Sequence, residues 1–207
     1  MTGDFRITLA YLKELGACRD GQREFRKAFP DGAGYQETLD KCADAGRVDF
    51  GKWLLDKLGP TDDVRIYQEP IEDRNKVIIF AGRIEFEADI NVKHIFAGCG
   101  IEAGLGIKAG CGIKAGCDIE AGRGIEAGWG IEAGWGIEAG YDIEAGWGYG
   151  IFAGIRVKIE LWSSLAIVEA NTKPTNLISG HWVEPNAQKN GGSYVETNYT
   201  TNPKRRV

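Results

Sequence analysis

A six-residue repeat fills the middle of this 207-residue chain. Across residues 95–154 the unit Ile-(Glu/Lys)-Ala-Gly-X-(Gly/Asp) recurs with almost no drift. Isoleucine and alanine stand at alternate positions with a charged residue between them, which is the pattern of a strand with one buried face. The two glycines of each unit oppose a long helix, because each costs about 1 kcal/mol relative to alanine. The short fixed period therefore predicts a β-solenoid.

Each unit supplies one short strand and one Gly-X-Gly corner, where we expect positive φ angles. Three units would build an eighteen-residue triangular coil that stacks on the next at about 4.8 Å. Asp118 and Asp142 replace the second glycine four units apart, which also suits a four-sided coil. The variable slot holds side chains as large as Trp129, so we expect it at an outward corner. The number of sides and the handedness remain open.

The chain divides into three parts by composition. We predict a helical N-terminal module at residues 1–62, a β-solenoid repeat domain at 63–160, and C-terminal strands with a polar tail at 161–207. The fold class is mainly β with an α N-terminal module: a β-solenoid (β-helix) of six-residue repeats, capped at both ends. The helical module would cover the N-terminal end. Residues 155–162 alternate as a strand, and with Leu177 and Val183 they would form a capping hairpin or sheet.

Charge and cysteine content bear on the expected binding partners and cellular compartment. A net charge of −5 argues against direct nucleic-acid binding by the whole molecule. No apolar run reaches the length of a membrane span, and the N-terminus lacks a signal-peptide layout, so we expect a cytoplasmic protein without membrane contact. Five cysteines without metal spacing suggest reduced thiols. Cys99 and Cys117 would stack in adjacent triangular coils, where a disulfide bridge is conceivable. The reducing cytoplasm expected for this chain favours free thiols instead.

Catalytic motifs are missing from the sequence. His94 and His181 have no motif around them, and we expect His94 to be a solvated coil residue. No Gly-X-Ser-X-Gly elbow and no P-loop occur. We therefore expect a non-enzymatic protein without cofactor or metal.

Acids and aromatics gather in the second half of the repeat. Seven acids and one base, Arg123, lie between Asp118 and Ile155. In a three-sided stack Glu102, Glu120 and Glu138 would form one column. Aromatic side chains are common binding anchors. The predicted binding residues are Glu120, Glu126, Trp129, Glu132, Trp135, Glu138, Tyr141, Asp142, Glu144 and Trp147.

Two resemblances extend this interpretation. The repeat resembles the hexapeptide-repeat, left-handed β-helix class, although that class places its small residue two positions before the aliphatic one. The stretch Leu12-Lys-Glu-Leu-Gly-Ala-Cys-Arg-Asp-Gly, with Phe25, Cys42 and Trp53-Leu-Leu, looks like helical modules that precede repeats in bacterial and prophage proteins. This second resemblance implies a phage-type protein that acts in the cytoplasm of a bacterial host.

Three functions follow as hypotheses. The first is an inhibitor, of the anti-CRISPR or anti-restriction type, that blocks a host protein or complex through its basic nucleic-acid-binding groove. Pentapeptide-repeat solenoids that mimic DNA are the analogy for this hypothesis. The second is a structural solenoid that self-assembles into a homo-oligomer, as a scaffold or virion component. The third is a glycan-binding module that uses the exposed tryptophans.

Overall fold

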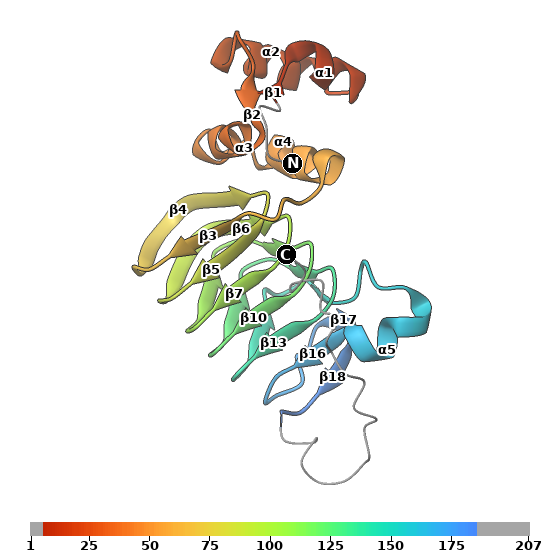
Figure 1. Cartoon of the computed structure of the whole chain (residues 1–207). Helices are drawn as coiled ribbons and strands as arrows, with labels where there is room; N and C mark the ends of the chain where they lie inside the picture. The colour runs from red at the N-terminus through yellow and green to blue at the C-terminus, as the bar shows by residue number, and fades with distance from the viewer. Residues whose placement is uncertain (1–5, 186–207) are drawn as a thin grey trace.

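The computed structural model describes residues 6–185 and shows four helices stacked on a β-solenoid (Figure 1). The helical part contains β1 (Arg6–Ile7), α1 (Leu9–Glu14), α2 (Arg19–Ala28), β2 (Ala33–Gly34), α3 (Tyr35–Asp44) and α4 (Val48–Leu58). Thr8 begins α1 by accepting a hydrogen bond from the backbone N–H of Tyr11 at 3.2 Å. The predicted fold class, a β-solenoid with an N-terminal helical module, is confirmed.

The solenoid has three faces, which we number in chain order. Face 1 contains β3 (Val64–Tyr67), β5 (Arg83–Phe86), β7 (Ile101–Ala103), β10 (Ile119–Ala121), β13 (Ile137–Ala139), β16 (Ile167–Glu169) and β18 (His181–Val183). Face 2 contains the first halves of β4 (Ile71–Phe80) and β6 (Ile90–Ala97), then β8 (Ile107–Ala109), β11 (Ile125–Ala127) and β14 (Ile143–Ala145). Face 3 contains the second halves of β4 and β6, then β9 (Ile113–Ala115), β12 (Ile131–Ala133), β15 (Ile151–Phe152) and β17 (Leu177–Ser179).

Strand register settles the number of sides. Ile119 lies beside Ile101 on one neighbouring strand and beside Ile137 on the other, in parallel pairing. Three six-residue units therefore complete one coil, and the four-sided alternative is excluded. Asp118 and Asp142 lie at two different corners as a result.

The core is a column of isoleucine and alanine that runs the length of the solenoid. Ile119, Ile131 and Ala133 are fully buried, and their counterparts in every regular coil are nearly so. Burying one such isoleucine stabilises the fold by roughly 1.5–3 kcal/mol relative to leaving it exposed. The charged residue between each isoleucine and alanine points outward, as the alternation predicted.

The corner glycines have a different role from the one we predicted. None of the repeat glycines from Gly98 to Gly146 has a positive φ, so that prediction was wrong. In most units the first glycine is instead required by crowding, and Gly104 and Gly110 are the exceptions. A Cβ on Gly134 would lie well under 3.0 Å from the carbonyl oxygen of Gly116 on the preceding coil. At the second position, as at Gly136, the nearest atom would be 3.2 Å away, which agrees with aspartate replacing only the second glycine.

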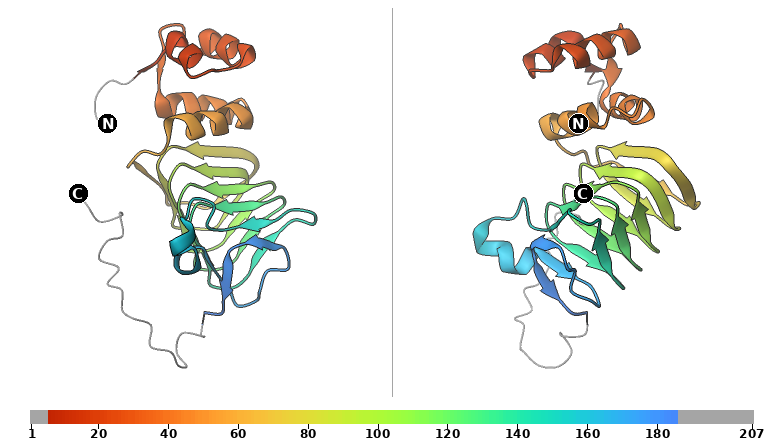
Figure 2. Two further views of the ribbon diagram at one scale, coloured as in Figure 1. Left: turned by 90° about the vertical axis from the view of Figure 1, so that its right-hand side faces the viewer. Right: turned by 180° about the vertical axis from the view of Figure 1, so that it is seen from behind.

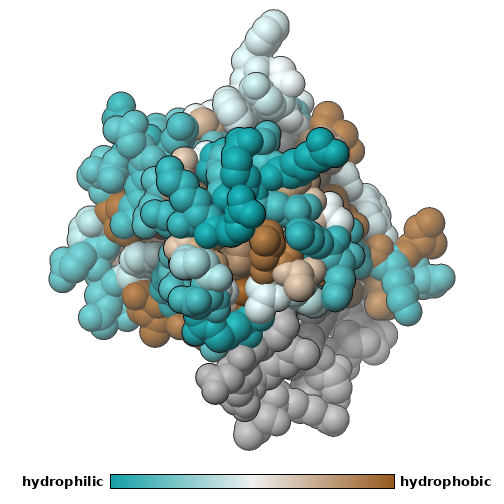
Figure 3. Space-filling view, turned by 90° about the horizontal axis from the view of Figure 1, so that it is seen from above, coloured by the Kyte–Doolittle hydropathy of each residue, from teal (hydrophilic) through white to brown (hydrophobic). Residues whose placement is uncertain are grey.

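The helical module covers the first coil, as predicted. Gln36 on α3 donates a hydrogen bond to the Ile79 carbonyl at 2.9 Å and accepts one from the Ala81 N–H at 2.9 Å. These two bonds occupy backbone groups at the C-terminal end of β4, an edge strand that would otherwise be open to another chain. Ile79 and Phe96 also pack into the helical core. Seen from the helical end, the surface is mainly hydrophilic (Figure 3).

The C-terminal strands extend the solenoid. β16 pairs in parallel with β13 and with β18, and β17 pairs in parallel with β15. The expected capping hairpin is therefore not formed, and part of the predicted segment 161–207 belongs to the solenoid. Residues 186–207, which include the predicted polar tail, lie outside the described residues.

Residues 155–162 do not form the predicted strand. After Gly154, whose φ is 77°, the chain makes a turn, a 3₁₀ helix η1 (Ile159–Leu161) and a short helix α5 (Trp162–Leu165). This segment is an insertion between β15 on face 3 and β16 on face 1, so it is not a strand of either face. It forms an arm beside the solenoid (Figures 1 and 2).

Candidate functional site

The ten predicted binding residues are distributed over all three faces. Glu120 and Glu138 lie on face 1, Glu126 and Glu144 on face 2, and Glu132 on face 3. Trp135 lies at the corner between faces 3 and 1, Tyr141 and Asp142 at the corner between faces 1 and 2, and Trp129 and Trp147 at the corner between faces 2 and 3. The acids and aromatics therefore do not make one continuous surface.

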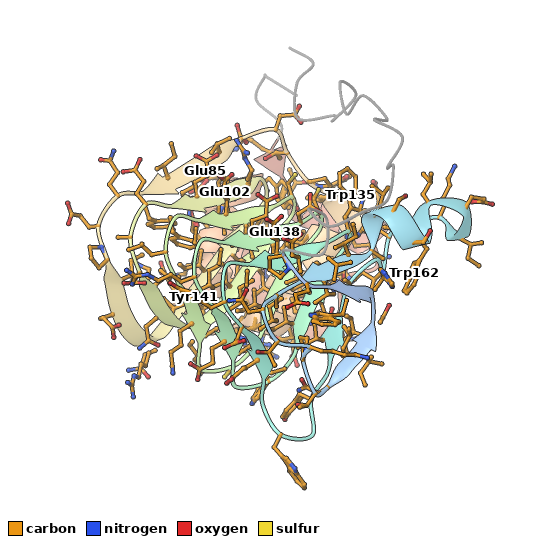
Figure 4. All side chains as sticks on the ribbon, turned by 90° about the horizontal axis from the view of Figure 1, so that it is seen from below. Glu85, Glu102, Trp135, Glu138, Tyr141 and Trp162 are labelled. Carbon is orange, nitrogen blue, oxygen red and sulfur yellow. The ribbon has the colours of Figure 1, made fainter. Side chains whose placement is uncertain are left out.

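Face 1 carries the strongest acidic feature. Five glutamates stand in register on five successive parallel strands, and we call them the glutamate ladder: Glu85, Glu102, Glu120, Glu138 and Glu169. The backbones of neighbouring members lie about 4.8 Å apart, because this is the spacing of paired strands. Figure 4 shows Glu85, Glu102 and Glu138 along this face, with Tyr141 and Trp135 toward its two edges.

Sequence periodicity found only the middle of this ladder. The column of Glu102, Glu120 and Glu138 was predicted for a three-sided stack and is confirmed. Glu85 and Glu169 were missed because they lie outside the regular repeat, and the insertion before β16 separates Glu169 from Glu138. The sequence around Glu85 does carry a signal, since Ile84-Glu85-Phe86 repeats the buried–acidic–buried pattern.

Positive charge compensates one end of the ladder. Arg83 pairs with Glu85 at 2.6 Å and with Glu102 at 3.5 Å. The register positions that follow on face 1 are acids at 120, 138 and 169. The ladder is therefore most acidic toward its C-terminal end.

Electrostatic repulsion is strongest at Glu138. Its partial burial, then the carboxylates of Glu169, Glu120 and Asp118, raise the pKa of this side chain above its usual value. Like charges held in one column cost stability unless a cation or a partner compensates them. Such a column is suited to accept hydrogen bonds from a row of lysine or arginine side chains.

On each of the other two faces a lysine pairs with a glutamate of the next coil. On face 2, Lys108 pairs with Glu126 at 2.6 Å. On face 3, Lys114 pairs with Glu132 at 3.3 Å. Each pair joins adjacent coils in register. These exposed pairs contribute little to stability, about 0–1 kcal/mol each, but they reduce the acidity of both faces relative to face 1.

Aromatic residues gather at the corner between faces 2 and 3. Trp129 stacks on Tyr149 with ring centroids 6.0 Å apart, and its edge meets His94 at 5.4 Å. The coil here is two residues longer than the usual eighteen, which pushes Trp147 out until its side chain is 99% exposed. Asn176 fixes the longer corner by donating to the Ala145 and Tyr149 carbonyls.

His94 is a packed residue of this corner. It is buried, its Nδ1 accepts a hydrogen bond from the Gly112 N–H at 3.2 Å, and its ring stacks on Phe96. Burial, with Lys93 and Lys52 nearby, lowers the pKa of the imidazole. The prediction of a solvated coil residue was wrong, because the neighbouring coils cover it. His181 is exposed.

The helical module contains an apolar groove of about 360 Å³, lined by residues that include Phe25, Phe29, Phe50 and Trp53. Cys42 is part of its wall, and burial raises the pKa of this thiol to about 11. The thiol is therefore protonated at neutral pH and acts as an apolar contact. Arg47 stacks over Phe50 at 3.9 Å and pairs with Glu24 at the edge of the groove.

Within residues 6–185, no group of three or more His, Cys, Asp or Glu side chains has the arrangement of a metal site. In the same part of the chain no helix is long and apolar enough to cross a membrane.

Comparison with known proteins identifies only the helical part. Residues 1–58 match the family model described as the YdhT N-terminal domain. This match ends with the last residue of α4, so the helical module is similar to a domain that occurs in other chains. Neither curated proteins nor solved structures gave a match to this chain.

Proposed function

We propose that this protein is a non-enzymatic binding protein whose glutamate ladder occupies the basic groove of a nucleic-acid-handling partner. The observation that carries the proposal is the unbroken register of five glutamates on five adjacent strands of face 1. A groove that binds nucleic acid presents rows of lysine and arginine to phosphates, and a fixed column of carboxylates is complementary to such a row.

The rigidity of the ladder supports this proposal. Each glutamate stands on a strand whose neighbours hold it in register, so little conformational entropy is lost when a partner binds. Repulsion at Glu138 adds a further gain, because a cationic partner would relieve it. A partner of this kind would be a nuclease or surveillance complex of a bacterial defence system. The protein would then be a phage-encoded inhibitor of the anti-CRISPR or anti-restriction type, a DNA mimic acting in the host cytoplasm.

The test compares two triple variants that remove the same charge. The first, Glu102→Gln, Glu120→Gln and Glu138→Gln, neutralises the centre of the ladder. The second, Glu126→Gln, Glu132→Gln and Glu144→Gln, neutralises faces 2 and 3. Each tagged protein is expressed in a bacterium that carries CRISPR and restriction systems and is purified at moderate salt, and the retained complex is challenged with double-stranded DNA.

We expect the unmodified chain to retain a DNA-binding protein that DNA displaces. The ladder variant should lose this protein at least tenfold, whereas the variant of faces 2 and 3 should keep it. Equal retention by both variants would reject the ladder as the binding face. Equal loss of the partner by both variants would show that the net charge of the chain alone is responsible for binding. Circular dichroism of both variants establishes that they are folded.

Self-assembly is the second candidate, and the arm at residues 155–165 favours it. Ile155, Ile159 and Leu161 are 46%, 89% and 49% exposed. Apolar side chains gathered on a projecting segment are typical of a contact between molecules. Light scattering that increases with concentration for the unmodified chain, and not for Ile159→Ser with Leu161→Ser, would favour a structural role.

The exposed aromatic corner keeps glycan binding as a third candidate. Trp147, Tyr149 and Ile178 surround an open hollow of about 740 Å³. A glycan-array signal that is lost in Trp147→Ala would support it.

A further inference from the structure

Two cysteines meet at the corner between faces 3 and 1. Cys99 and Cys117 occupy the same position in successive coils, and the N–H of Cys117 donates to the carbonyl of Cys99 at 3.1 Å. Their sulfur atoms are 3.1 Å apart and make a hydrogen bond. Both side chains are partly exposed, and neither forms a disulfide in this structure.

The spacing of adjacent coils at this corner suits a disulfide. Residues paired in adjacent strands lie about 4.8 Å apart, within the range of about 4.4–6.8 Å between the Cα atoms of bridged cysteines. The sulfurs need to approach by only about 1 Å to reach the bond length of about 2.05 Å.

We propose that Cys99 and Cys117 form a redox-active dithiol that closes to a disulfide between adjacent coils when it meets a small disulfide such as oxidised glutathione. The site is independent of the proposed function of the glutamate ladder. Its chemistry depends only on the two thiols and on the groups around them.

The surroundings assign the two sulfurs different roles. The hydrogen bond to Cys99, followed by burial, raises the pKa of Cys117, and Asp118 adds to this effect while Arg156 opposes it. Cys117 therefore keeps its proton longer. Cys99 is the expected attacking thiolate, because thiol–disulfide exchange proceeds through the thiolate.

The exchange runs in two balanced steps. The Cys99 thiolate attacks oxidised glutathione, forming a Cys99–glutathione mixed disulfide and releasing one glutathione thiolate, which takes up a proton. Cys117 then gives its proton to solvent and attacks the sulfur of Cys99, which releases the second glutathione. Two protein thiols are oxidised to one disulfide, and one glutathione disulfide is reduced to two glutathione molecules.

Other cysteines provide controls within the same chain. Cys111 fills the equivalent slot at a different corner, between faces 2 and 3, so it has no cysteine at its position on the adjacent coil. The slot also accepts leucine, arginine, tryptophan and tyrosine in other units, so replacing these cysteines should leave the solenoid folded.

The experiment incubates the full chain with oxidised glutathione, blocks the remaining thiols with N-ethylmaleimide and maps tryptic peptides. Trypsin separates Cys99, Cys111 and Cys117 into the peptides 94–108, 109–114 and 115–123. We expect peptides 94–108 and 115–123 to be linked in the folded protein. Closure should be about tenfold or more faster than in the urea-unfolded chain, because the fold holds the two thiols together.

The variants define the outcomes. Cys111→Ser should form the same link, and Cys99→Ser should form none involving Cys117. The proposal is overturned if Cys99 and Cys117 are both alkylated in the folded protein after oxidation. A stable glutathione adduct on Cys99, or links that include Cys111 equally often, would overturn it as well.

Discussion

Glu138 lies in register beside Glu120 on the adjacent strand of face 1, with Glu169 on its other side. Partial burial and these neighbours raise the pKa of Glu138 above its ordinary value of 4.5. A carboxyl group with a raised pKa binds protons more readily in the folded chain. The free energy of unfolding should therefore fall as the pH rises through the interval between 4.5 and the raised pKa, and it should recover as the pH falls.

The first prediction concerns this repulsion. Glu138→Gln should raise the Tm at pH 7, because the amide has the shape of the carboxyl group without its charge. The difference from the unmodified protein should shrink as the pH approaches 4.5 and Glu138 becomes protonated. Thermal unfolding followed by circular dichroism between pH 4 and pH 8 measures it. An equal rise in Tm for Glu144→Gln, on face 2, would show that the net charge of the chain governs the Tm, and would contradict local repulsion at Glu138.

The second prediction tests the crowding at the first glycine of the repeat. Gly134→Ala would place a Cβ against the Gly116 carbonyl oxygen, and relief of this overlap should cost about 1–3 kcal/mol or more. Gly110→Ala is the matched control, because the nearest atom to its Cβ would be the Val92 carbonyl oxygen at 3.8 Å. Urea unfolding should show a large loss for the first variant and a change below about 1 kcal/mol for the second. Similar losses would contradict the crowding explanation.

The third prediction concerns the stacked core. Ile119 is fully buried between Ile101 and Ile137, so Ile119→Ala should lower the free energy of unfolding by about 2–5 kcal/mol. Ile119→Val removes one methyl group from the same site and should cost about 0.5–1.5 kcal/mol. Chemical unfolding of both variants measures the two losses in the free energy of unfolding. If alanine cost no more than valine, the isoleucine column would not be the main source of stability.

The fourth prediction follows from the proposed dithiol. A disulfide between Cys99 and Cys117 would join residues 18 positions apart. By the chain-entropy model it should stabilise the folded protein by about 3 kcal/mol. The oxidised form should therefore have a higher Tm than the reduced form, and Cys117→Ser should remove the difference. A lower Tm on oxidation would mean that closing the bond strains the corner.

Much of the fold could be predicted from the sequence. The alternation of isoleucine, charge and alanine placed the strands and their buried faces correctly, and the phase of the repeat placed Glu102, Glu120 and Glu138 in one column once three sides were assumed. The prediction of strand structure failed at residues 155–162, where alternation is present but the chain leaves the coil after Gly154 and forms η1 and α5. Alternation identifies a strand only where the fold offers it an edge.

The sequence by itself determined the repeat, the inward isoleucines and the outward acids, because these depend on the two-residue period of a strand. Only the tertiary structure decided that three units close a coil, since every six-residue unit has the same local pattern and closure depends on pairing between distant strands. The same pairing brought Glu85 and Glu169 into the glutamate ladder across irregular segments, and divided the remaining acids between faces 2 and 3. It also set Cys117 beside Cys99, because a corner side chain finds its neighbour one whole coil away.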